Sequence, residues 1–97
     1  MATYITLGNF TEQGVRAIQD TTRRADALRA KAKTLGITVK DVFWTLGSVD
    51  TVTIVDAPDE AAVTALWMSV GAQGNLRTQT LRAFTADEVG PILKNLG

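Results

Sequence analysis

The sequence of 97 residues contains no cysteine and no histidine. Without cysteine there is no disulfide framework, no thiolate nucleophile and no cysteine–zinc site. Without histidine, imidazole catalysis and the usual transition-metal sites are excluded. We therefore expect neither a bound metal ion nor another cofactor.

The chain also lacks an excess of either charge and lacks long apolar runs. The charges of ten basic and ten acidic residues cancel, which argues against electrostatic binding of nucleic acid. No run approaches the roughly 20 apolar residues of a membrane span, and Met1-Ala2-Thr3-Tyr4 has no basic start typical of a signal peptide. These absences favour a cytoplasmic protein with no nucleic-acid or membrane partner, folded as one domain over residues 1–97.

Apolar and β-branched residues alternate with polar ones in several segments, which predicts strands. Ile5 and Leu7 alternate with Tyr4 and Thr6 in the first segment. Gly47 lies in the short connection between the second and third segments, as expected for a β-hairpin. The predicted strands are residues 3–8, 37–46, 49–56 and 76–82.

Apolar residues that recur every three or four positions predict helices between these strands. The first helix covers residues 11–35, begins at Thr11 as its N-cap and ends before Gly36. The cations outside its apolar stripe are interpreted as a solvated face: Arg16, Arg23, Arg24, Arg29, Lys31 and Lys33.

The second helix is predicted at about residues 60–72, with Asp59 as its N-cap. Few polar residues interrupt its circumference, so we expect it to be buried on more than one side. Thr85-Ala86-Asp87-Glu88 is a capping box for a short C-terminal helix. We expect Trp67 and Met68 to pack under that last helix.

The element order β-α-β-β-α-β with an added helix predicts an α+β, ferredoxin-like domain. Two helices cover one face of a four-stranded antiparallel sheet, and the other face is open. We assign a mildly polar set of strand residues to the open face: Tyr4, Thr6, Thr51, Thr53 and Val55. The opposite set then faces the helices: Ile5, Leu7, Val52 and Ile54. An open face without charges favours homo-oligomerisation through it, and Thr53→Lys is expected to loosen the assembly.

The segment Trp44-Thr45-Leu46-Gly47-Ser48-Val49-Asp50, followed by residues 52–59, resembles the GYD domain family, named for a glycine-x-tyrosine-aspartate signature. Gly47 and Asp50 match the signature, and Val49 stands where the tyrosine is expected. The resemblance extends over nearly the whole chain. It implies a dimeric α/β barrel, in which copies of the chain associate as a homodimer or a larger assembly.

Asp50 has two interpretations. A buried carboxylate near a sheet end can act as a general acid or base, and the wider barrel group includes monooxygenases and isomerases. Alternatively, Asp50 points to the helix side and accepts bonds from backbone N–H groups around Thr11 to Gly14, beside a positive helix terminus. The predicted topology favours this anchoring role.

Two functions remain open. The first is a homo-oligomeric binding or regulatory module, with a small-molecule ligand or a protein partner held at the sheet interface. The alternative is a cofactor-independent enzyme, monooxygenase- or isomerase-like, that acts on a small molecule in a cavity between facing sheets. Tyr4, Trp44 and Arg77 are the predicted ligand-binding residues, and Asp50 is the catalytic candidate.

Overall fold

Four antiparallel strands form one sheet in the computed structural model, which describes residues 1–97. The strands are β1 (Ala2–Phe10), β2 (Thr38–Trp44), β3 (Thr51–Ala57) and β4 (Leu76–Ala83). Their order across the sheet is β2-β3-β1-β4. This order, with helices in the two crossovers, confirms the predicted α+β, ferredoxin-like topology.

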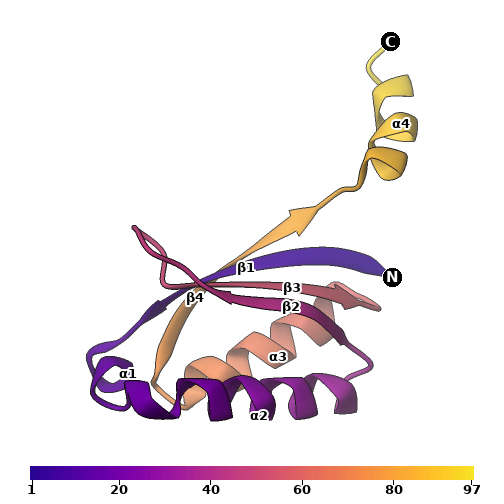
Figure 1. The fold of residues 1–97 in the computed structure, drawn as a ribbon. Coiled ribbons are helices and arrows are strands. Elements are labelled where there is room, and N and C mark those ends of the chain that lie inside the picture. Colours follow the sequence, from indigo (N-terminus) through magenta and orange to yellow (C-terminus); the bar gives the residue numbers. More distant parts are fainter.

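The helical elements are α1 (Glu12–Arg16), the short 3₁₀ segment η1 (Ile18–Asp20), α2 (Thr21–Thr34), α3 (Glu60–Ala72) and α4 (Ala86–Lys94). Both α2 and α3 lie on one side of the sheet, and no helix covers the other side (Figure 1). Asp59 caps α3 as predicted, because its carboxylate accepts a bond from the Ala62 N–H at 2.8 Å. No helix is both long and apolar enough to cross a bilayer.

The prediction of one continuous first helix is wrong, because the chain breaks at Ala17 into α1, η1 and α2. The loop before β4 holds α1 in place. The Thr11 N–H donates to the Asn75 carbonyl oxygen at 3.1 Å, and a Cβ atom at Gly14 would lie 2.1 Å from that same oxygen. The chain therefore turns at Ala17 before α2 begins. At this break the Ala17 carbonyl oxygen accepts a hydrogen bond from Arg24 Nη1 at 3.0 Å.

The two faces of the sheet are the reverse of the prediction. The set assigned to the open face is buried beneath the helices, with 0% to 8% of each residue exposed: Tyr4, Thr6, Thr51, Thr53 and Val55. Threonine fits there because its methyl group packs while its hydroxyl finds a partner, and the Thr6 and Thr80 hydroxyls share a hydrogen bond of 2.9 Å. Both sets contain β-branched residues, so alternation separates the sets without deciding which one is covered.

The core lies between this face and the two helices. Ala32, Val55 and Leu66 are 0% exposed, and Trp67 packs among them at 7% exposed. The predicted packing of Trp67 and Met68 under the C-terminal helix is wrong. The β4 strand carries the chain away from α3 before α4 begins (Figure 1), so Met68 stays 69% exposed.

The connection between β2 and β3 covers residues 45–50 and is longer than the predicted Gly47-Ser48 turn. Gly47 adopts a φ of +137°, a conformation that side chains rarely take. The loop closes where the Thr45 N–H donates to the Asp50 carbonyl oxygen at 2.8 Å. This closure places Asp50 at the base of the hairpin.

Candidate functional site

The uncovered face of the sheet carries six apolar side chains, which we call the open-face cluster: Ile5, Leu7, Phe43, Val52, Ile54 and Leu81. The strand register places them together, because directly paired residues share a face. Phe43 and Leu81 are 50% and 42% exposed, and the other four are half-buried. Adjacent apolar side chains on an uncovered sheet are typical of an association surface.

Asp50 is fixed to the end of β1. Its Oδ2 accepts a bond from the Phe10 N–H at 2.9 Å, and its own N–H donates to the Gly8 carbonyl oxygen at 2.9 Å. The predicted partners around Thr11 to Gly14 are wrong, because the Thr11 hydroxyl caps Gly14 and Asp50 bonds one residue earlier. The sheet-face reversal also removes the predicted helix-side orientation. A catalytic role for Asp50 stays a prediction.

The three residues predicted to bind a ligand do not converge. Tyr4 lies under the helices, 5% exposed, with the Arg82 guanidinium 5.7 Å from its ring centroid. Arg77 pairs with Asn9 near the other end of β1. Trp44 ends β2 and lines a cavity on the helix side of the sheet. The ligand-binding roles of all three residues stay predictions.

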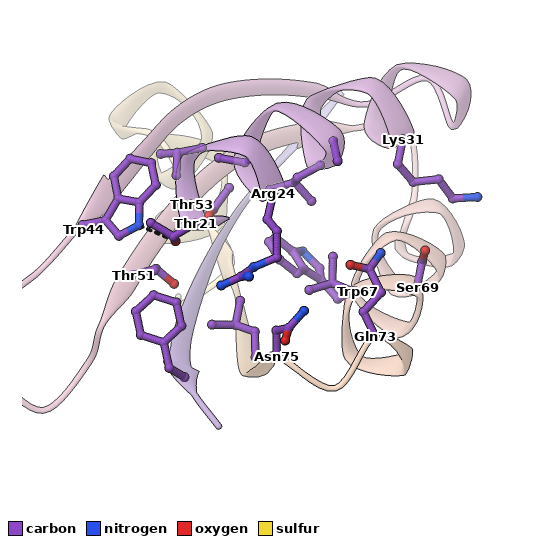
Figure 2. A pocket seen from close by; sticks show the side chains of 17 residues that line it. Thr21, Arg24, Lys31, Trp44, Thr51, Thr53, Trp67, Ser69, Gln73 and Asn75 are labelled. Carbon is purple, nitrogen blue, oxygen red and sulfur yellow. Dashed lines mark hydrogen bonds between the residues drawn. The ribbon is translucent and has the colours of Figure 1, made fainter. Parts of the chain in front are cut away.

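The cavity has a volume of about 90 Å³ and lies between α2, α3 and the sheet (Figure 2). Trp44 borders it, and its Nε1 donates to Thr21 Oγ1 at 2.9 Å. The Arg24 side chain reaches in from α2 toward Trp67 of α3 (Figure 2). Neither residue was predicted to line a site: Arg24 was interpreted as part of a solvated face with several other cations of its helix, and Trp67 as a packing residue. No signal in the sequence brings them together.

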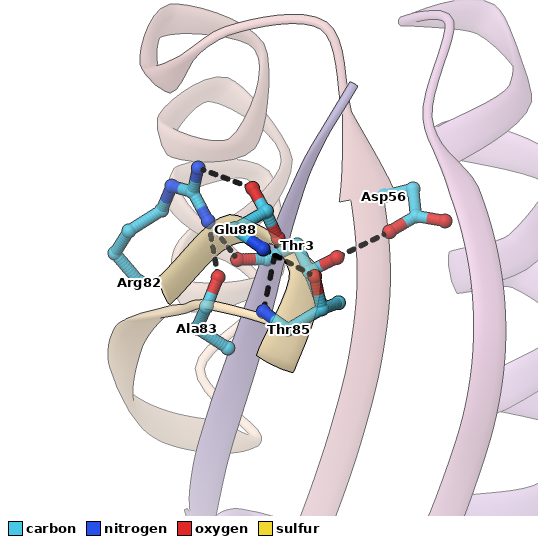
Figure 3. A network of polar contacts seen from close by, with 6 residues as sticks. All are labelled: Thr3, Asp56, Arg82, Ala83, Thr85 and Glu88. Carbon is cyan, nitrogen blue, oxygen red and sulfur yellow. Dashed lines mark hydrogen bonds and ion pairs between the residues drawn. The ribbon is translucent and has the colours of Figure 1, made fainter. Parts of the chain in front are cut away.

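A separate polar network fixes the start of α4 to the sheet edge (Figure 3). The Thr85 N–H donates to Glu88 Oε1 at 3.0 Å, which completes the predicted capping box. Arg82 Nη2 lies 3.3 Å from Glu88 Oε2, and the same guanidinium stacks 4.3 Å from the Phe84 ring centroid. The bond from the Thr85 backbone, followed by the bond from Arg82, lowers the pKa of Glu88 from its ordinary value.

Comparison with known proteins identifies the family. Residues 4–93 match the sequence profile of the GYD domain, from β1 into α4. The chain belongs to the GYD domain family. This GYD domain is 26% identical over 95 residues to a Thermus thermophilus protein named glutamine synthetase and cystathionine beta-lyase binding protein. That similarity covers 97% of this chain and 100% of the relative.

Proposed function

We propose that this GYD domain is a small binding module that self-associates through the open-face cluster and then docks on other proteins. The observation that carries the proposal is the cluster itself. Six apolar side chains lie on one face of a four-stranded sheet, and no helix of the chain covers them. Burial of such a surface against a second copy is favourable, at roughly 25 cal/mol per Å² of apolar area.

Charge supports an apolar mode of association. The chain carries equal numbers of acidic and basic residues, so long-range attraction to a partner of one charge sign contributes little. Asp41 and Arg77 flank the cluster on β2 and β4, in the same sheet face as their register partners Ile54 and Asn9. Such charges at a rim fix the register of an interface more than they strengthen it.

The relative supports a protein partner. The Thermus thermophilus protein is named for binding two enzymes, and it matches this GYD domain over its full length. We infer a function of the same class here, a module that associates with another protein. The helix α4, which stands apart from the sheet (Figure 1), exposes Ile92 and Leu93, and Leu96 is exposed just beyond its end, so this segment offers a second apolar contact.

Sedimentation velocity tests the association. Thr53→Lys does not test it, because Thr53 is 4% exposed beneath the helices. Val52→Lys is the correct variant, since Val52 lies in the open-face cluster beside Leu7 and Phe43. We expect the parent to sediment as a multiple of 10.4 kDa and Val52→Lys as a folded monomer, because association would then bury an added lysine charge within an apolar surface.

Ala65→Lys is the matched control. Ala65 is exposed on α3, away from the open face, so the same added charge should leave the assembly intact. A parent protein that sediments at 10.4 kDa at micromolar concentration contradicts the proposed association.

A further inference from the structure

The cavity between α2, α3 and the sheet contains two hydrogen-bond donors without acceptors. Arg24 Nη2 and Trp67 Nε1 are both buried, and neither has a partner in the structure. Trp67 is 7% exposed as a whole residue, so its indole N–H is shielded from bulk water. Buried donors are nearly always paired, and an orphan of this kind costs stability unless something binds it.

The charge of the cavity is also uncompensated. Its lining contains Arg24 and Lys31 and no aspartate or glutamate. The ion pairs of the structure involve Arg16, Arg23, Lys40 and Arg82, and leave Arg24 without a carboxylate. The acid four residues before Arg24, Asp20, is held instead by Arg23 at 2.5 Å. A partly buried guanidinium without a counter-charge favours an anion beside it.

Further donors and apolar walls surround these two groups. Asn75 Oδ1 accepts a bond from Gln13 Nε2 at 3.0 Å, which leaves the Asn75 amide N–H as a donor at the cavity. Nine of the 17 lining residues are hydrophobic, among them Phe10 and Leu28. The volume of about 90 Å³ is well above the ~10–15 Å³ that one water needs. Lys31 and Gln73 at the rim are exposed, so the cavity reaches the surface there.

We infer that this cavity binds a small organic carboxylate. A carboxylate only accepts hydrogen bonds, and it therefore suits the unpaired N–H groups of Arg24 and Trp67. The apolar walls contact the carbon skeleton of the same molecule, whereas an inorganic anion would leave them unfilled. The site lies on the helix-covered side of the sheet, opposite the open-face cluster, and does not depend on the proposed self-association.

Nuclear magnetic resonance with benzoate as the probe tests the site. The Trp67 indole N–H signal reports directly on the donor, and Trp44→Phe assigns it by removing the other indole signal. We expect benzoate to shift the Trp67 signal saturably. Benzamide has the same ring and no charge, so it should bind roughly tenfold or more weakly.

Arg24→Gln should weaken benzoate binding by roughly tenfold or more and abolish the preference over benzamide. Arg23→Gln is the matched control: Arg23 is adjacent, exposed and paired with Asp20, so its loss should leave benzoate affinity within about twofold of the parent value. Both variants should sediment like the parent, which separates this site from the proposed association. An unchanged Trp67 signal at millimolar benzoate overturns the inference, as does equal binding of benzamide or undiminished benzoate affinity in Arg24→Gln.

Discussion

The two faces of the sheet differ in the kind of interaction that each lacks within the chain. The helix-covered face contains buried donors that have no acceptor, at Arg24 and Trp67. The open face carries apolar side chains that no helix of the chain covers. An unpaired donor requires a hydrogen-bond acceptor at a defined position, whereas an apolar surface can be buried against any surface of matching shape. One face therefore favours a small polar molecule, and the other favours a macromolecule.

The largest expected effect separates these faces at neighbouring residues of β3. Thr53→Lys adds a charge beneath the helices, where Thr53 is 4% exposed and shares the cavity with Arg24. It should lower the free energy of unfolding by about 3–5 kcal/mol, because the new charge is buried without a partner. Val52→Lys adds the same charge to the open face and should leave the monomer folded.

Urea denaturation followed by circular dichroism measures both variants against Ala65→Lys. Equal stability of Thr53→Lys and Val52→Lys would mean that the two faces do not differ in burial as described.

A smaller effect is expected where Asp50 joins the β2–β3 connection to β1. Asp50→Ala removes the acceptor for the Phe10 N–H and should cost about 1–3 kcal/mol of stability, because a part-buried donor is left unpaired. Asp50→Asn retains an acceptor oxygen and should cost less. Denaturant titration of the two variants gives the order, and an Asp50→Ala protein as stable as the parent would favour a catalytic Asp50 over an anchor.

The smallest effect concerns the capping box of α4, at the edge of both faces. The Thr85 N–H and Arg82 lower the pKa of Glu88 from its ordinary value of 4.5. A lowered pKa in the folded state means that the charged form is stabilised there. The stabilisation is present above pH 4.5 and is lost as the pH falls through the lowered value.

We expect hydrogen exchange of the α4 backbone amides to quicken below pH 4.5, beyond the intrinsic pH dependence of exchange, while the amides of α3 show no such added change. In Glu88→Gln this pH-dependent step should disappear. A step of the same size in that variant would assign the titration to another group.

Local signals in the sequence predicted the elements whose ends are held by their own residues. Asp59 and the Thr85–Glu88 box mark the starts of α3 and α4, because each cap is a contact within three residues. The break at Ala17 was not predictable in this way, since it depends on the carbonyl of Asn75, which lies far along the chain. The covered face was not predictable either, because threonine satisfies the same alternation whether it is buried or open.

In the candidate site, too, features set by adjacent residues were predictable, and features that depend on residues far apart in the chain were not. The family resemblance and the position of Asp50 near the end of a strand follow from adjacent residues. The cavity requires Arg24 of α2 and Trp67 of α3 to meet across the helix layer. Arg24 has five cationic neighbours in the same predicted helix, and only the packing of α2 on the sheet turns this one inward.

Both tryptophans of the chain line the cavity, and none lies in α4 or in the open-face cluster. The intrinsic tryptophan emission of the protein thus comes from one place, where α2 and α3 pack on the sheet. Far-ultraviolet circular dichroism, by contrast, also records the nine residues of α4. If α4 melts first, the dichroic signal changes while the emission stays constant. If the unfolding transitions recorded by emission and by circular dichroism do not coincide in this protein, early unfolding of α4 explains the difference. A partly unfolded core is then not required.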